Sequence, residues 1–249
     1  MKSRVRKIGI VAGWLAAWQA LSLLMHNSIV LVGPAETVAA LCALLPEGVF
    51  WSSLGTSFLQ IVCGFLLGSF SGIALAFLAF RKRLFGEVMA PFVTALKTVP
   101  VASFIILALI WFGSSGLALF TSFIVVFPML YLNTLEGLGS LDPKLMEMAQ
   151  VYHIPAGSRL RCIYFPGIAS YLRGSFELAL GMSWKSGVAA EVIGQHLGTI
   201  GNGLYRAKIN LDTAQLLAWT LVIILISYCF EKVFLALFDR LLPYRTGNS

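Results

Sequence analysis

The sequence predicts an all-α integral membrane protein with about six transmembrane helices. Hydrophobic residues make up 58% of the 249 residues and charged residues only 12%, and the mean hydropathy is +0.85. This composition is typical of a chain surrounded mostly by hydrocarbon. A helix needs about 20 apolar residues to cross a bilayer. Four uncharged runs provide such lengths: 8–35, 50–80, 98–135 and 213–230.

The first two spans are predicted at 8–26 and 54–80. A basic N-terminal stretch precedes the first apolar run, which is long and lacks a small-residue cleavage site, so we interpret it as a retained span and not a signal peptide. In the second span, glycines recur every four residues at Gly64, Gly68 and Gly72. This spacing allows close helix contact, and we favour packing within the subunit over a subunit interface.

The run 98–135 is too long for one helix, and Gly113-Ser114-Ser115-Gly116 interrupts it with residues typical of a tight turn. We therefore predict a third span at 92–112 and a fourth at 117–137. The fifth, 170–194, carries four charged residues, but omitting it would leave the long polar loops on the wrong side. The sixth is predicted at 214–238.

Positive charge determines the predicted orientation. With the N-terminus inside, thirteen basic residues fall on or near cytoplasmic segments and two fall outside. The thirteen are Lys2, Arg4, Arg6, Lys7, Arg81, Lys82, Arg83, Lys144, Arg159, Arg161, Arg173, Arg240 and Arg245, and the two are Arg206 and Lys208. Both termini are then cytoplasmic. Anionic lipid headgroups suffice to explain the net charge of +7, and we expect no nucleic-acid partner.

The polar segment 138–169 lies between the fourth and fifth spans. Asp142 can cap a helix that begins at Pro143 and runs to about Tyr152, with apolar and charged residues interleaved as in a helix that lies against another surface. The stretch 154–157 breaks this helix. A second, basic helix is predicted from Ser158 to Phe165, ending at Pro166-Gly167.

This segment resembles the cytoplasmic loop of the permease subunits of binding-protein-dependent ABC importers. The family pattern is Glu-Ala-Ala, a glycine six residues after the glutamate, then isoleucine and a Leu-Pro pair. The matching residues are Glu147, Met148, Ala149, His153, Ile163, Phe165 and Pro166. Met148 replaces an alanine. His153 replaces the glycine that can adopt positive φ, so either Gly157 shares the turn or the loop is altered.

The rest of the chain is similar to the nitrate, sulfonate and taurine branch of that family. The similar stretches are 32–38, 53–72, 99–100, 110–113, 133–134, 142–143 and 188–194. The resemblance implies a type I permease fold, with one transmembrane domain at 1–249, a core at about 50–240 and a coupling loop at 138–169. The implied ATPase-coupling residues are Glu147, Met148, Ala149, His153, Pro155, Ala156, Gly157, Ile163 and Pro166.

The resemblance also implies a function. Such a subunit moves a small solute across the bacterial cytoplasmic membrane, and we expect an anion such as a sulfonate, taurine or nitrate. Expected partners are cytoplasmic ATPase subunits, an extracytoplasmic solute-binding protein, a second copy of the chain and membrane lipid. The sequence contains no phosphate-binding loop or nucleophile elbow, so we expect no enzyme activity and no cofactor, with ATP bound by the partner. A thiamine-precursor pyrimidine is an alternative substrate, and a channel or scaffold without an ATPase is an alternative class.

Ionisable residues inside predicted spans are candidates for the translocation pathway, because each costs about 3 kcal/mol or more in the bilayer centre without a partner or water. The candidates, with neighbouring residues, are Lys97, Pro100, Trp184, Lys185 and Glu191. Alternatively, Lys97 extends to the inner interface, and Lys185 and Glu191 form structural bonds to other spans. The three histidines, His26, His153 and His196, lie in separate segments, so we expect no metal site.

Overall fold

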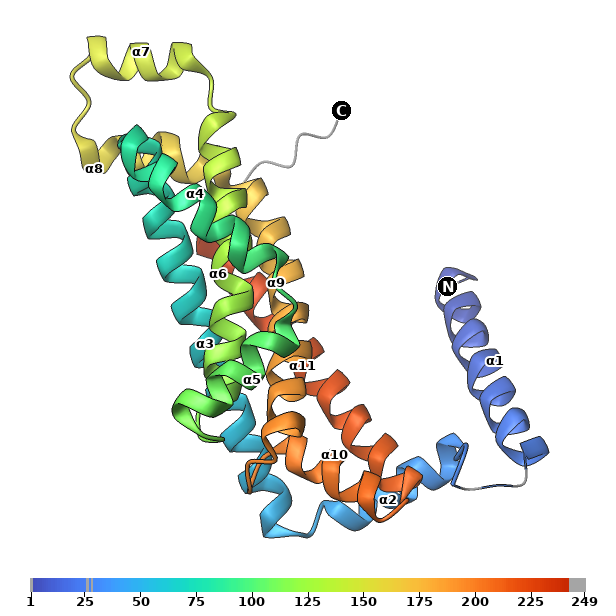
Figure 1. Cartoon of the computed structure of the whole chain (residues 1–249). Coiled ribbons are helices and arrows are strands. Elements are labelled where there is room, and N and C mark those ends of the chain that lie inside the picture. The colour runs from blue at the N-terminus through green and yellow to red at the C-terminus, as the bar shows by residue number, and fades with distance from the viewer. Residues whose placement is uncertain (1, 26, 28, 242–249) are drawn as a thin grey trace.

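The computed structural model describes residues 2–25, 27 and 29–241, and its regular elements are all helical (Figure 1). Two features of the sequence analysis, His26 and Arg245, lie outside the described residues. The helices are α1 (Lys2–Met25), α2 (Pro34–Leu44), α3 (Gly48–Arg81), α4 (Arg83–Thr98), α5 (Val101–Phe112), α6 (Leu117–Gly139), α7 (Pro143–Val151), α8 (Ala156–Arg159), a π-helical turn (Leu160–Tyr164), α9 (Phe165–Gly194), α10 (Ile200–Ile209) and α11 (Thr213–Leu241).

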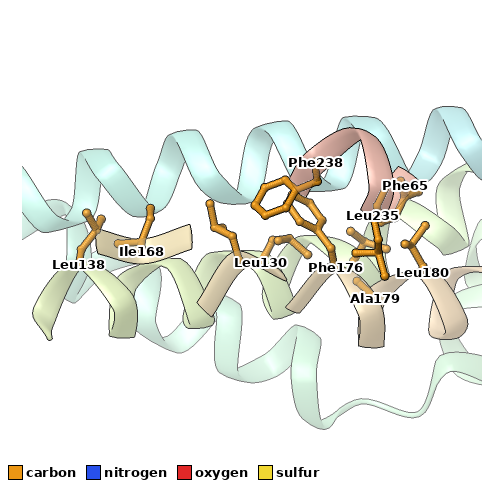
Figure 2. Packing of buried hydrophobic residues seen from close by; sticks show 11 residues of the cluster. Phe65, Leu130, Leu138, Ile168, Phe176, Ala179, Leu180, Leu235 and Phe238 are labelled. Atoms are coloured by element: carbon orange, nitrogen blue, oxygen red, sulfur yellow. The ribbon is translucent and has the colours of Figure 1, made fainter. Parts of the chain in front are cut away.

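Helices α3, α6, α9 and α11 enclose the main hydrophobic core (Figure 2). Most of its buried side chains come from α6 and α9, while α3 contributes one and α11 contributes two. The buried members are Phe65, Val126, Leu130, Leu138, Ile168, Leu172, Phe176, Ala179, Leu180, Leu235 and Phe238. Phe176 of α9 makes edge-on ring contacts with Phe238 at 5.2 Å and with Phe234 at 5.1 Å between centroids. These contacts hold the last span against α9.

The glycines of α3 lie against the backbone of α6. A Cβ atom at Gly68 would lie 3.0 Å from the carbonyl oxygen of Phe123, and one at Gly72 would lie 2.8 Å from that of Phe127. At Gly64 a Cβ atom would overlap the carbonyl oxygen of Leu119. The α3 glycines and the α6 carbonyl oxygens that they face thus both recur every four residues. The predicted packing of these glycines inside the subunit is confirmed.

Three helices, α3, α6 and α11, are individually long and apolar enough to cross a membrane. The pair α4 and α5 passes the same test together, which gives up to four spans by length and composition. Helices α1 and α9 have 24 and 30 residues, or about 36 and 45 Å at 1.5 Å per residue, against a hydrocarbon thickness of about 30 Å. Both are long enough to cross, although neither is among the helices that are also apolar enough, and six spans remain the prediction.

The third predicted span, 92–112, is not one continuous helix. Helices α4 and α5 bend by 100° at the break between Thr98 and Val101. Pro100 lacks an N–H and disfavours helical geometry in the residue before it. Val99 accordingly has φ −69° and ψ 133°, and Pro100 becomes the N-cap of α5.

The second helix of the 138–169 segment was also wrongly bounded. It begins at Ala156, two residues before the expected Ser158, and it does not end at Pro166. Instead the π-helical turn leads directly into α9, with the Phe165 N–H donating to the Leu160 carbonyl oxygen. The wider turn accommodates a proline that would clash with an ordinary α-helical repeat.

Two short helices that the sequence analysis did not delimit, α2 and α10, lie at the end of the bundle opposite α7 (Figure 1). They pack with α11 around Leu44, Phe50, Ile200 and Trp219. Helix α1 stands apart from the bundle in the same view. Its indole at Trp18 donates from Nε1 to the carbonyl oxygen of Val32 at 3.0 Å, which ties α1 to the start of α2.

Candidate functional site

Helix α7 crosses the end of the bundle between α6 and α8 (Figure 1). The Asp142 carboxylate oxygen Oδ1 accepts from the N–H of Lys144 at 2.9 Å, and Pro143 occupies the first turn. Both features were predicted. Aspartate at this position satisfies a free donor and complements the helix dipole, so the start of α7 is set by two adjacent residues.

The end of α7 is a Schellman motif centred on His153. The His153 N–H donates to the Gln150 carbonyl oxygen, and the Ile154 N–H donates to that of Ala149, both at 3.0 Å. This pattern requires a left-handed residue after the helix, usually glycine, and His153 has φ 49°. The positive φ that the family's glycine implies is therefore present. Gly157 lies inside α8 and does not share the turn.

Arg159 reaches back from α8 to the end of α7. Its Nη2 donates to the carbonyl oxygens of Ala149 at 3.4 Å and Ile154 at 3.3 Å. A cation near a helix C-terminus is favoured by the dipole. Arg159 was predicted only as a charge that favours the cytoplasmic side. No pattern in the sequence predicts its hydrogen bonds to the end of α7.

The outer face of α7 carries unpartnered apolar side chains. Leu145 and Met148 are each 43% exposed, and Tyr152, just after the helix, is 75% exposed. Their spacing of three and four residues places them on one face. Glu147 is also exposed. Ala149, in contrast, is completely buried, so its side chain is not part of this exposed face.

The remaining predicted coupling residues follow α7 in the chain. Pro155 is the N-cap of α8, and Ala156 and Gly157 are exposed in its single turn. Ile163 is half-buried in the π-helical turn, and Pro166 is exposed in the first turn of α9.

Glu191 is buried at the opposite end of the bundle, with 1% of its surface exposed. Its Oε2 accepts from Ser57 Oγ at 2.8 Å and from the N–H of Gly201 at 2.9 Å. The same Ser57 Oγ accepts from the N–H of Ile200 at 2.9 Å. The carboxylate thus joins α3, α9 and the first turn of α10, where a negative charge is favoured. The burial and hydrogen bonds of Glu191 favour the structural alternative over the pathway alternative.

Trp184 and Lys185 are adjacent in sequence but face opposite environments. Trp184 is 2% exposed and packs against Phe58, with 6.0 Å between ring centroids. Its expected place on the pathway surface is therefore wrong. Lys185 is exposed, and no hydrogen bond or ion pair to it occurs among residues 2–25, 27 and 29–241. The ion pair that was the structural alternative for Lys185 is therefore absent from this part of the chain.

Lys185 belongs to an exposed face of α9. Gly174, Leu178 and Met182 precede it on this face, and Ala189 follows it. The intervals of four, four, three and four residues match one side of a helix. Because glycine and alanine let another helix approach closely, this face can meet a second protein surface.

Lys97 and Pro100 lie at the bend between α4 and α5. Lys97 is in the last turn of α4, and both residues are exposed. The break leaves backbone groups that need burial or water if they lie at membrane depth. Their positions fit both roles considered for Lys97, which are lining the translocation pathway and extending to the inner membrane interface.

Comparison with known proteins identifies the family. A family model described as the inner membrane component of binding-protein-dependent transport systems matches residues 64–244. The chain belongs to this family. It lies in the nitrate and sulfonate branch of the ABC importer permeases, as the relatives below indicate, and it is therefore a transporter subunit and not itself an enzyme.

Relatives with several substrates support this branch. A candidate aliphatic sulfonates transport permease of Bacillus subtilis is 26% identical over 94% of this chain and 85% of its own length. A nitrate import permease of Leptolyngbya laminosa is 26% identical over 64% of this chain and 56% of its own. A bicarbonate transport permease of Synechococcus elongatus is 24% identical over 65% and 57%, respectively.

Proposed function

We propose that this permease imports a small anion across the bacterial cytoplasmic membrane, and that α7 couples it to a cytoplasmic ATPase. The observation that carries the coupling role is the exposed apolar face formed by Leu145, Met148 and Tyr152 on a helix at the end of the bundle. Apolar side chains on a short polar segment outside the core are typical of a partner surface. The family supplies the partner class.

The anion is supported by two independent features. The three relatives described above are named for aliphatic sulfonates, nitrate and bicarbonate, which are all anions. Lys185 adds an exposed positive charge to α9 without a carboxylate partner among the described residues. An unpaired cation within a span is costly unless it faces water or solute, and a pathway for anions provides such an environment.

We further propose that two copies assemble around the α9 face that carries Gly174, Lys185 and Ala189. The exposed glycine and alanine permit close approach, and a two-fold arrangement would bring Lys185 of each copy toward a shared route. In this arrangement α7 and both termini face the cytoplasm, as the charge distribution predicts. ATP-driven movement of the α7 pair then shifts the route between outward and inward access.

The coupling role is tested by charge substitutions on α7 in vesicles that contain the ATPase and the binding protein. Met148→Glu introduces a charge into the apolar face and should lower both ATPase retention and solute-stimulated hydrolysis at least tenfold, since buried interface anchors contribute about 2 kcal/mol or more. The matched control is Gln150→Glu, because two residues correspond to about 160° around a helix. If Met148→Glu behaves like Gln150→Glu, α7 is not the coupling element.

The substrate class is tested separately through the binding protein. Its melting temperature should rise with a sulfonate, nitrate or bicarbonate, because a bound ligand stabilises the folded state. A thiamine-precursor pyrimidine serves as the uncharged comparison. A rise with the pyrimidine alone would refute the anion proposal while leaving the coupling role of α7 intact.

A further inference from the structure

An apolar groove lies between the last turns of α3 and the α8 end of the 138–169 segment. Its volume is about 730 Å³, within the range of about 300–1,000 Å³ found for ligand pockets. Phe70, Ile73 and Phe77 line it from α3, and Leu160 and Tyr164 line it from the π-helical turn. Phe70 is 77% exposed, so the groove opens to the outside of the bundle.

Two arginines also line the groove. Arg81 is the last residue of α3, and Arg159 closes the other side from α8. None of the lining residues in the described part of the chain is acidic. The Nε of Arg159 is buried and has no hydrogen-bond partner among residues 2–25, 27 and 29–241. A buried donor without a partner is costly, so a small movement of the guanidinium toward an anionic oxygen in the groove would be favoured.

We propose that this groove binds one anionic phospholipid, with its phosphate at Arg81 and Arg159 and an acyl chain along α3. The lining from Phe70 to Arg81 spans eleven residue steps, or about 16 Å of helix. This length equals about half of a 30 Å hydrocarbon core, which is the depth of one leaflet. Arginine suits the phosphate because its planar guanidinium can donate two parallel hydrogen bonds.

Both parts of the groove are needed to select this ligand. Inorganic phosphate would use the arginines and leave the aromatic surface bare. A zwitterionic lipid would fill the apolar part, but its headgroup carries no net negative charge for the two arginines. An anionic phospholipid satisfies both, because basic residues near a membrane surface attract anionic lipids.

The groove lies next to the hydrogen bonds that join Arg159 to the end of α7. The same Arg159 that lines the groove donates from Nη2 to the carbonyl oxygens of Ala149 and Ile154. A phosphate bound to its guanidinium would hold this side chain in place and thereby stiffen the turn after α7. This consequence rests on the proposed coupling role, whereas binding of the lipid does not.

The test measures lipid binding to the purified full-length chain without the ATPase, so its result does not depend on coupling. Native mass spectrometry would count retained phosphatidylglycerol against phosphatidylcholine. Arg81→Gln should weaken phosphatidylglycerol binding about fivefold, as the loss of one charge contact near the membrane implies. Ala74→Trp should also weaken it, because Ala74 lines the groove and the indole would fill it without removing a charge.

The matched control is Arg83→Gln. Arg83 is a neighbouring exposed arginine that pairs with Glu87 at 3.0 Å and does not line the groove, so binding should be unchanged. Equal retention of the two lipids would overturn the proposal, as would unchanged binding in Arg81→Gln. Displacement of the lipid by millimolar inorganic phosphate would also overturn the proposal, because the arginines would then bind free anions. Loss of the lipid when the chain dimerises would overturn it too, because a second copy would then occupy the groove. Should Ala74→Trp not fold, Arg159→Gln provides the second binding measurement.

Discussion

Alanine at Gly64 should destabilise the bundle through the closest contact between α3 and α6. The added Cβ would overlap the carbonyl oxygen of Leu119 and lie 2.8 Å from the Cβ of Ser122. Neither atom can rotate away, because one is backbone and the other is attached directly to it. The helices must therefore separate, and overpacking of this kind costs about 1–3 kcal/mol. The gain in helix propensity offsets about 1 kcal/mol at most.

The three α3 glycines form a graded series. Gly64→Ala should lower the free energy of unfolding by about 2 kcal/mol and Gly72→Ala by about 1 kcal/mol, given that the latter Cβ would lie 2.8 Å from a carbonyl oxygen. Gly68→Ala should be mildest, because its nearest distance is 3.0 Å. The measurement is unfolding of the purified chain by SDS in mixed micelles.

The control for this series is Gly55→Ala, on the same helix. No atom lies within 4 Å of the position that its Cβ would take, so this variant should be neutral or more stable by up to about 1 kcal/mol. If Gly64→Ala unfolds at the same SDS concentration as Gly55→Ala, the close contact between α3 and α6 does not exist as described.

Three further predictions concern the candidate site. Glu191→Ala leaves two buried donors unsatisfied and should lower the free energy of unfolding by about 3 kcal/mol. Glu191→Gln keeps an acceptor oxygen and should lower it by only about 1 kcal/mol. Equal losses in the two variants would refute the hydrogen-bonding role. Lys185→Met should reduce anion uptake at matched expression, while Lys232→Met, which removes a lysine paired with Glu231, should not; equal uptake by both variants excludes Lys185 from the pathway. His153→Gly should stabilise the loop by up to about 1 kcal/mol in thermal unfolding, because φ is positive; clear destabilisation would show that the imidazole itself contributes.

Local signals in the sequence predicted much of the fold. The turn at 113–116 has two glycines with positive φ, 73° at Gly113 and 78° at Gly116, as its composition indicated. Asp142 and Pro143 begin α7 as expected, because capping depends on residues next to each other. These features need no knowledge of distant contacts, so one sequence suffices for them.

Features that depend on tertiary packing could not be predicted in the same way. Neighbours on a helix point about 100° apart, but only the surrounding helices determine that Trp184 faces the core and Lys185 faces outward. One of the two hydrogen-bond partners of Glu191 is Ser57, 134 residues away, and nothing in either local sequence links them. The 100° bend before α5 had a local sign in Pro100, but its size is set by how both helices pack.

The C-terminal end of α7 shows how this chain compensates for its departure from the family's glycine. A left-handed non-glycine residue costs about 1–2 kcal/mol, and His153 is held there by the two backbone hydrogen bonds of the Schellman motif. The two further donations from Arg159 favour the same geometry through a charged donor, each contributing about 1 kcal/mol or more. Since Arg159 is continuous through the π-helical turn with α9, these bonds connect the end of α7 to a span. In the proposed coupling role, these bonds would link a displacement of α7 to α9, which carries Lys185.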